Sequence, residues 1–276
     1  MPALPAPEGE IRATMLEYAE EPGLWIPLAP PSEVLEADGY AVVTSLYSAS
    51  VERVRLGPDD VERAVEEVRV RARGEGWRYV TWWLGELTEP RDLAERLLEL
   101  GLAPDADEAH MTSCWIDRRP NGEPAVEVHR VETADEFVAA LELDWDVWGV
   151  PEHKRAGYRP VQRDAWPLLE DDGRLAIYVA YLDGRPVGFG RLVFAPAAGI
   201  LLGGSTLPAA RGLGVYTSLV HARWDATAAR GVPRLAVSAG HMSGPILERL
   251  GFESIGKVFL LRDTLQDSPT QGSVPA

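Results

Sequence analysis

The sequence predicts an α/β protein of the mixed α+β type, with two similar domains in tandem, each a mixed β-sheet flanked by helices. Three observations predict this fold class. Strand-like and helix-like segments alternate in the second half of the 276 residues. The first half has the same order of elements, and its helix end LLELGL resembles the later LERLGF. The turn-rich segment DRRPNGEPAVEV lies between the halves, so we expect a domain boundary near residue 121.

The second half contains the clearer elements. TADEFVAALELDW predicts a helix with Thr133 as its N-cap. Asp183-Gly184 lies between two strand-like runs and predicts a hairpin. GILLGGSTLP and PRLAVSA predict strands on either side of a helix, so these two strands should pair in parallel. SGPILERLGF predicts a short helix, with Ser243 as its cap and Gly251 in the left-handed conformation at its end.

The helix between those two strands, GVYTSLVHARWDATAARG, has apolar residues at the spacing of one helical face. This predicted stripe consists of Val215, Leu219, Ala222, Ala226 and Ala229. We expect His221, Arg223 and Trp224 to serve packing or the solvated surface and to bind no ligand.

The first half repeats this order. DVERAVEEVRVRARGEG predicts a helix with an apolar stripe, and RYVTWWL predicts a strand. EPRDLAERLLELGL predicts a second helix that ends at Gly101, as the later helix ends at Gly251. Strand-like AHMTSCWI and KVFLL follow these glycines. The order of elements favours an internal repeat, and chance similarity of amphipathic helices is the alternative.

Composition excludes several classes of function. The net charge of −16 disfavours a nucleic-acid-binding protein, because phosphate binding requires a basic surface. The single cysteine, Cys114, allows no internal disulfide, and we interpret it as a small buried thiol. We expect no metal site. No apolar run approaches the roughly 20 residues that span a bilayer, and the N-terminus has no export signal, so we expect a cytoplasmic protein without membrane contact.

The stretch PAARGLGVYTS has the residues of an anion site. Glycines at 212 and 214 come just before a predicted helix, whose first N–H groups have no partner within the helix. Arg211 adds a fixed positive charge, so the loop could hold a phosphate group. The alternative is an ordinary turn between a strand and a helix.

The residues around this loop resemble the acetyl-CoA-binding half of the GCN5-related N-acetyltransferase (GNAT) family. Arg211 and Gly214 match the family motif of Arg or Gln, two residues, Gly, one residue, then Gly or Ala. Leu250-Gly251-Phe252 matches the later signature, and the Asp183-Gly184 hairpin resembles the second and third strands. The resemblance implies that acetyl-CoA is the cofactor. It implies a cofactor site formed by Gly204, Ser205, Thr206, Arg211, Gly212, Leu213, Gly214, Val215, Tyr216 and Thr217.

Three positions depart from the family pattern. Tyr216 stands where the motif has Gly or Ala, Gly240 where many members have asparagine, and Leu247 where a tyrosine often acts as general acid. In the first half, Leu56-Gly57-Pro58-Asp59-Asp60 stands in place of the anion loop. Two carboxylates at a helix N-terminus compete with an anion for the same amides, so we expect the first half to bind no acetyl-CoA.

The chemistry requires a group that removes a proton from an amine, because alkyl ammonium groups have a pKa near ~10. The strand GILLGGSTLP contains no acid. His241 and Ser205 are the candidate catalytic residues, the histidine with a surface or capping role as its alternative. Trp145, Asp146 and Trp148 could bind a cationic acceptor by cation–π and charge contacts, and core packing with solvated acids is the alternative.

We therefore expect three segments. Residues 10–120 would form a degenerate GNAT-like domain, residues 124–262 the acetyl-CoA-binding domain, and residues 263–276 a flexible tail. The expected function is acetyl transfer to a small, cationic amine by a monomer or homodimer. The alternatives are an acyl-CoA-binding protein without turnover and an interaction scaffold without cofactor.

Overall fold

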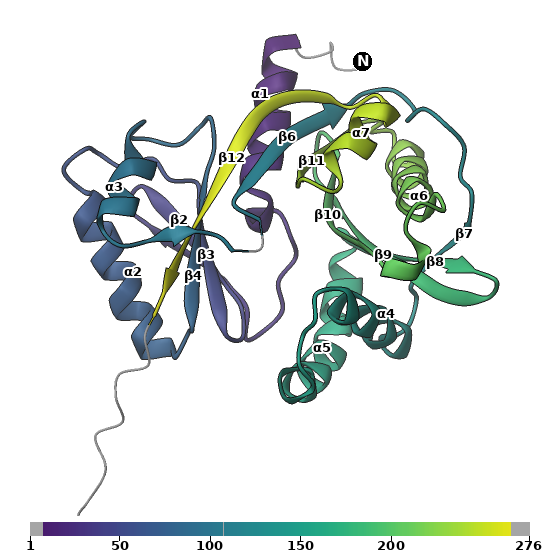
Figure 1. The fold of residues 1–276 in the computed structure, drawn as a ribbon, viewed down its shortest axis with the longest axis horizontal. Helices are drawn as coiled ribbons and strands as arrows, with labels where there is room; N and C mark the ends of the chain where they lie inside the picture. Colours follow the sequence, from purple (N-terminus) through teal and green to yellow (C-terminus); the bar gives the residue numbers. More distant parts are fainter. Residues whose placement is uncertain (1–7, 107, 266–276) are drawn as a thin grey trace, which may run out of the picture. The chain divides into compact units, whose positions relative to one another are not determined.

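A computed structural model of the protein describes residues 8–106 and 108–265 (Figure 1). These residues form two compact units. The larger unit contains residues 8–30 and 110–258, and the smaller contains residues 31–109, except 107, together with 259–265. Each unit combines helices with a mixed sheet, as the sequence predicted.

The smaller unit has two helices and a sheet with the strand order β1-β2-β3-β4-β12. Its elements are β1 (Val34–Ala37), β2 (Tyr40–Thr44), β3 (Ser48–Glu52), α2 (Val61–Glu75), β4 (Tyr79–Leu84), α3 (Leu93–Glu99), β5 (Ala103–Pro104) and the end of β12 (Glu253–Thr264). Strands β3 and β4 are parallel and α2 connects them. The α2 stripe predicted from the sequence is buried in the core of this unit.

The larger unit has the strand order β6-β11-β10-β9-β8-β7. Its strands are β6 (His110–Ile116), β7 (Glu127–Arg130), β8 (Leu175–Leu182), β9 (Arg185–Phe194), β10 (Gly199–Thr206), β11 (Leu235–Ala239) and the start of β12. Its helices are α1 (Glu8–Glu20), α4 (Ala134–Val147), α5 (Glu152–Asp172), α6 (Val215–Ala229) and α7 (Gly244–Leu250), with short 3-10 turns η1 (Pro22–Leu24) and η2 (Pro208–Ala210).

Several local predictions for this unit are confirmed. Thr133 caps α4 in a reciprocal capping box with Glu136. Asp183 and Gly184 have positive φ in the β8–β9 turn, and Gly251 has φ +94° at the end of α7. Strands β10 and β11 pair in parallel. Ser243 occupies the N-cap position of α7 but makes no capping hydrogen bond, because its hydroxyl donates to the Gly240 carbonyl.

The compact units differ from the predicted continuous domains at three elements. Helix α1 and strand β6 belong to the larger unit, where β6 pairs with β11. Residues 259–264 of β12 pair with β4 in the smaller unit. Turn signals show where the chain reverses but not which strand it joins, so the sequence did not predict this exchange. Strand β12 also runs to Thr264, past the predicted start of the tail, and residues 266–276 of that tail lie outside the described residues.

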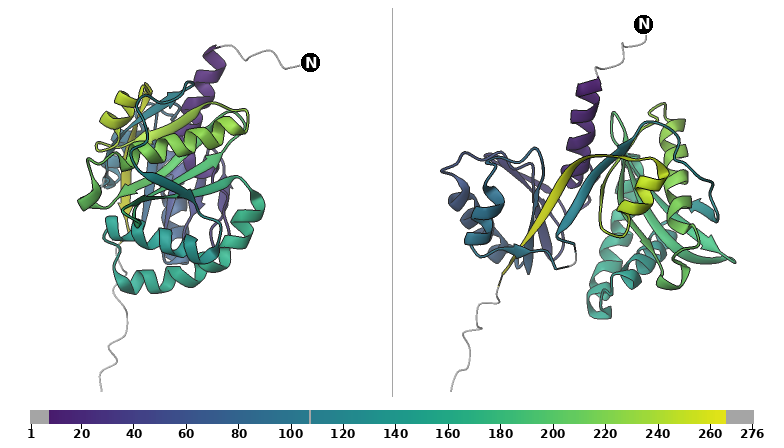
Figure 2. Two further views of the ribbon diagram at one scale, coloured as in Figure 1. Left: turned by 90° about the vertical axis from the view of Figure 1, so that its right-hand side faces the viewer. Right: turned by 45° about the horizontal axis from the view of Figure 1, so that its top comes forward.

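Helix α6 lies across β8, β9 and β10 (Figure 2). Its contact with the sheet depends on three strand glycines. A Cβ on Gly188 would lie 2.4 Å from Val215, one on Gly190 would lie 3.1 Å from Arg223, and one on Gly199 would lie 2.5 Å from Thr227. The sheet-facing ridge is therefore Val215, Leu219, Arg223 and Thr227, at a spacing of four residues.

This ridge corrects the predicted stripe of α6. Val215 and Leu219 are buried as predicted, but Ala222 and Ala226 are only half-buried and Ala229 is exposed. His221, Arg223 and Trp224 are all buried, so none of them serves the solvated surface. The polar ridge residues fit because the glycines of β9 and β10 leave room for them.

Candidate functional site

The loop before α6 has the conformation that its glycines allow. Strand β10 ends at Thr206, η2 follows, and Gly212 and Gly214 both have φ +78°. Gly214 is the residue before the first turn of α6. A left-handed backbone at both positions is strained for residues with a side chain, so the two glycines are required by the turn itself.

The N–H groups of residues 212–217 donate to no backbone carbonyl among the described residues. They lie at the N-terminus of a helix of 15 residues, where the helix dipole adds partial positive charge. Arg211 and Leu213 are exposed beside them, and the Arg211 side chain donates to the Thr206 carbonyl at 3.4 Å. This end of α6 can therefore accept a phosphate group.

Ser218 fixes the segment that precedes β7 to the start of α6. Its hydroxyl accepts hydrogen bonds from the amides of Ala125 and Val126 at 2.9 and 3.1 Å, and it donates to the Gly214 carbonyl at 3.0 Å. A Cβ on Gly214 would lie 2.6 Å from the Cβ of Ala125. The loop geometry is thus determined by packing as well as by its glycines.

Beyond its first residues, one edge of strand β10 pairs with no other strand in the described part of the chain. It pairs with β11 only at Gly199 and Ile200, whereas its pairing with β9 continues to Thr206. The Leu207 amide donates to the Val187 carbonyl on β9. Because hydrogen-bonding direction alternates along an antiparallel ladder, the N–H groups of Gly204 and Thr206 point away from β9, toward the unpaired edge.

The end of this edge has a further unsatisfied group. The Thr206 hydroxyl oxygen is buried and has no hydrogen-bond partner among the described residues. Buried polar atoms in native proteins are almost always satisfied, so an unpartnered one beside free amides is consistent with a ligand that supplies the missing partners. The residues present therefore fit an extended, polar ligand that ends in a phosphate.

Ser205 lies on the opposite face of β10, toward α4. It is 3% exposed, and its hydroxyl donates to Oδ1 of Asp144 on α4 at 2.8 Å. Oδ2 of Asp144 has no hydrogen bond or ion pair with any described residue. The sequence analysis identified Ser205 but missed Asp144. The sequence feature that could have identified Asp144 is its place on the apolar stripe of α4, three residues after the buried Leu141.

Tyr216 packs inward from the first turn of α6. Its ring would lie 2.8 Å from a Cβ on Gly204. Burial raises the pKa of Tyr216, while Arg223 and Ser243 act in the opposite direction. The tyrosine ring therefore covers the α6-facing side of β10 at Gly204, beside the unpaired edge. It leaves less room for a ligand at this point of the strand.

The other predicted site residues do not converge on the pair of Ser205 and Asp144. His241 is exposed in the loop after β11. Trp145 is buried against Tyr158, with ring centroids 5.7 Å apart, while Trp148 is 59% exposed. His241 has the surface position, and Trp145 the packed position, that the sequence analysis kept as alternatives, whereas Trp148 is not packed in the core.

The acidic residues near these tryptophans are already neutralised. Arg155 contacts Asp146 at 2.6 Å and Glu142 at 3.2 Å, and Arg159 pairs with Glu142 as well. Asp146 is therefore held by an arginine within the unit. We accordingly place the carboxylate that could bind an amine at Asp144 rather than at Asp146.

Cys114 on β6 has no features of a nucleophile. Burial raises the pKa of its thiol to about 11. A thiol of that pKa carries almost no thiolate near neutral pH, which agrees with the structural role predicted from the sequence.

In the smaller unit, the loop Leu56–Asp60 stands at the corresponding position, and the carboxylate of Asp60 occupies its interior. A Cβ on Gly57 would lie 2.7 Å from the Asp60 carboxylate, and that carboxylate accepts a hydrogen bond from Arg63 at 2.9 Å. The helix start where an anion would bind is thus occupied by negative charge.

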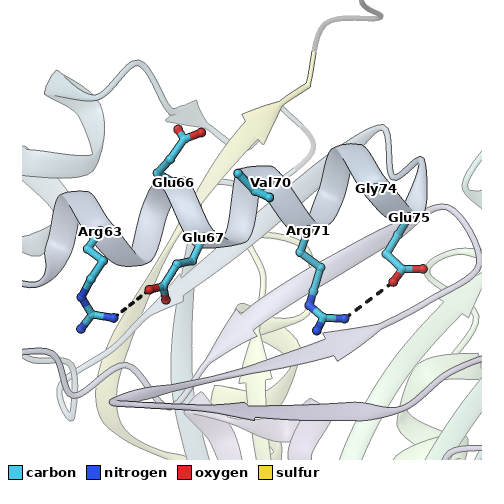
Figure 3. A pocket seen from close by; sticks show the side chains of 7 residues that line it. All are labelled: Arg63, Glu66, Glu67, Val70, Arg71, Gly74 and Glu75. Atoms are coloured by element: carbon cyan, nitrogen blue, oxygen red, sulfur yellow. Dashed lines mark hydrogen bonds and ion pairs between the residues drawn. The ribbon is translucent and has the colours of Figure 1, made fainter.

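A surface pocket of the smaller unit lies on one exposed face of α2 (Figure 3). Its lining alternates in charge, with Arg63 paired to Glu67 at 2.9 Å and Arg71 to Glu75 at 3.6 Å. Pairs four residues apart are typical of a solvated helix surface. The remaining charged residue of the lining, Glu66, pairs with Arg73 at 3.2 Å, so we assign no function to this pocket.

The described residues contain neither a membrane-spanning helix nor a cluster of metal-binding side chains. None of their helices combines the length and the apolar character needed to cross a bilayer. No group of three or more histidine, cysteine or acidic side chains among them is arranged to hold a metal ion.

The chain is similar to known acetyltransferases in part of its sequence and in its fold. Residues 117–243 match the acetyltransferase (GNAT) domain family. A solved structure of a GCN5-related N-acetyltransferase from Kribbella flavida has a TM-score of 0.61 at 19% identity, over 84% of this chain and 89% of that one. A tandem GNAT protein from the clavulanic acid biosynthesis pathway has a TM-score of 0.56 at 15% identity, over 96% and 98%. No curated protein sequence matches the chain.

Proposed function

We propose that the protein transfers an acetyl group from acetyl-CoA to the amine of a small cationic acceptor, because residues 117–243 match the GNAT acetyltransferase domain family. One observation carries the proposal. The unpaired edge of β10 joins a set of free amides at α6 on one side to the pair of Ser205 and Asp144 on the other. Acetyl-CoA supplies an activated acetyl thioester when bound.

Each part of the site has a distinct task. The amides of residues 212–217 and Arg211 would bind the pyrophosphate of the coenzyme. The N–H groups of Gly204 and Thr206 would bind its pantetheine arm and orient the thioester carbonyl. Because these groups are held by the β10–β9 ladder, they would need no rearrangement at the moment of reaction.

Asp144 would act on the acceptor. The Ser205 hydroxyl holds Oδ1, so the carboxylate has one orientation and presents Oδ2 to an ammonium group. Asp144 would first pair with the ammonium and then accept one of its protons. Water would then take this proton from the Asp144 carboxyl group. This assignment supplies the acid that the strand GILLGGSTLP lacks, from a neighbouring helix.

The proposal predicts the products of an acceptor screen. The protein is incubated with acetyl-CoA and three primary amines of similar length: 1,4-diaminobutane, 4-aminobutanol and 4-aminobutyrate. We expect release of the CoA thiol in equal amount to acetylated amine, measured by mass spectrometry, with 4-aminobutyrate the poorest acceptor because the negative charge at its far end is repelled by the Asp144 carboxylate. CoA release without acetylated amine, or preference for 4-aminobutyrate, would contradict the proposal.

Tyr216 favours a second candidate, an acyl-CoA-binding protein without turnover. Its ring occupies space beside Gly204 that the family motif leaves open with Gly or Ala. This candidate predicts acetyl-CoA binding with no CoA release in the presence of any amine, so the same screen separates the two functions.

A further inference from the structure

Arg223 is a buried cation without an acidic partner. It has no exposed surface, and it makes no ion pair with any described residue. Burial lowers the pKa of its guanidinium, and the nearby hydroxyls of Tyr216 and Tyr178 act against this. A buried charge of this kind is costly unless its surroundings use it, so its contacts indicate its role.

The hydrogen bonds of Arg223 go to three backbone carbonyls, one within α6 and two at an irregularity of the β10–β9 ladder. Nε donates to the Leu219 carbonyl at 2.9 Å, and Nη1 donates to the carbonyls of Arg191 at 3.1 Å and Gly203 at 3.4 Å. The β10–β9 register shifts between Leu202 and Gly204, and Gly203 has φ +55°. The guanidinium therefore contacts both β9 and β10 at the bulge in their ladder.

The neighbouring strand is shaped to admit this side chain. A Cβ on Gly190 would lie 3.1 to 3.3 Å from three guanidinium atoms, so Gly190 provides the room that Arg223 uses. Nη2 is buried and has no hydrogen-bond partner among the described residues. The arginine is therefore anchored at Nε and Nη1, and its guanidinium carbon lies 5.9 Å from the centroid of the Tyr216 ring.

The peptide that Arg223 contacts also carries the N–H group at the proposed reaction site. The Gly203 carbonyl and the Gly204 N–H belong to one trans peptide, so they point in opposite directions. The Gly204 N–H therefore points away from the guanidinium, toward the unpaired edge. A charged donor on the carbonyl polarises the peptide and strengthens its N–H as a donor.

We propose that Arg223 is a positioning residue for acetyl transfer, which holds the Gly203 carbonyl at the β10 bulge and thereby orients and strengthens the Gly204 N–H that faces the thioester carbonyl. This inference rests on the proposed function. It assigns a role in the reaction to a residue that makes no contact with coenzyme or acceptor.

The test uses Arg223→Met, which keeps the length of the side chain and removes its charge and donors. The readouts are kcat, the acetyl-CoA dissociation constant, and the infrared carbonyl stretch of bound acetyl-CoA labelled with carbon-13 at the thioester. Loss of one hydrogen-bond donor at such a site lowers kcat about 10²- to 10³-fold. Because the Gly204 N–H is weakened rather than removed, we expect a loss of about 10- to 100-fold, with a dissociation constant within about threefold of wild type.

The carbonyl stretch separates positioning from general destabilisation. We expect the wild-type protein to lower this frequency relative to free acetyl-CoA, and Arg223→Met to lose most of the shift. Thr227→Val is the matched control, because Thr227 is 1% exposed on the same ridge and its hydroxyl bonds only the Arg223 carbonyl. The control should lose stability and keep both the shift and kcat.

Arg223→Lys keeps the experiment decisive if the methionine variant does not fold. A lysine retains the charge but cannot hold both carbonyls as the planar guanidinium does, so we expect an intermediate shift. Wild-type kcat and carbonyl frequency in either folded variant would overturn the inference while leaving the proposed function intact. Absence of acetyl-CoA binding in the wild-type protein would overturn both.

Discussion

Replacing Asp144 with asparagine is expected to lower kcat for acetyl transfer about 10²- to 10⁴-fold, the usual contribution of a positioned acid or base. The substitution keeps the hydrogen bond from Ser205 possible and removes only the negative charge at Oδ2. Because the anion loop and the β10 edge are unchanged, the acetyl-CoA dissociation constant should stay within about twofold of wild type. Steady-state kinetics and calorimetry on the same preparation measure the two quantities.

Asp146→Asn is the matched control for Asp144→Asn. Asp146 lies two residues along the same helix, is exposed, and pairs with Arg155. An exposed ion pair contributes at most about 1 kcal/mol to stability and should contribute nothing to turnover. Equal loss of kcat in both variants, or no loss in Asp144→Asn, would show that Asp144 does not act on the acceptor.

Gly188→Val is expected to destabilise the larger unit by about 1–3 kcal/mol and to weaken acetyl-CoA binding at least about tenfold. A Cβ at position 188 would lie 2.4 Å from Val215 and 3.2 Å from Leu219, the first two residues of the α6 ridge. The start of α6 must then move away from β9. Because the amides that would bind pyrophosphate belong to this first turn, stability and coenzyme affinity should fall together.

Gly74→Val is the control for the same change of side chain. Gly74 is exposed on α2, and a Cβ there meets nothing within 4 Å. We expect its free energy of unfolding to change by less than about 0.5 kcal/mol, with unchanged coenzyme binding. Denaturant unfolding and calorimetry check both variants. If the Gly188→Val protein is destabilised but binds the coenzyme with normal affinity, the start of α6 is not part of the cofactor site.

Local chemistry made much of the fold predictable. The Thr133 capping box, the Asp183-Gly184 hairpin and the positive φ of Gly212 and Gly214 follow from residue type and spacing alone. The parallel pairing of β10 and β11 follows from the order of strand, helix and strand. These features depend on a few adjacent residues, and no distant partner decides them.

Features that depend on distant partners were not predictable. The Asp144–Ser205 hydrogen bond joins residues 61 positions apart, and nothing near Ser205 indicates a carboxylate. The burial of Arg223 depends on Gly190 in another strand, so the periodicity of α6 alone gave the wrong stripe. The exchange of β6 and the end of β12 depends on which strand edge each segment joins.

Thermal unfolding with acetyl-CoA tests the central claim, that the loop before α6 and the β10 edge bind this coenzyme. Ligand at about 100 times its dissociation constant stabilises a protein by about 2.7 kcal/mol, which corresponds to roughly 5–10 °C at this size. NAD also contains a pyrophosphate and should give no shift. Leu213→Asp should abolish the shift without changing the melting temperature of the free protein, because Leu213 is 48% exposed and the new carboxylate repels the phosphates.

We predict a shift with acetyl-CoA in the wild-type protein, none with NAD, and none in Leu213→Asp. Leu98→Asp in the smaller unit, 41% exposed, is the control and should keep the wild-type shift. No shift at millimolar acetyl-CoA would contradict the account: PAARGLGVYTS would then be only a turn, with Tyr216 closing the site.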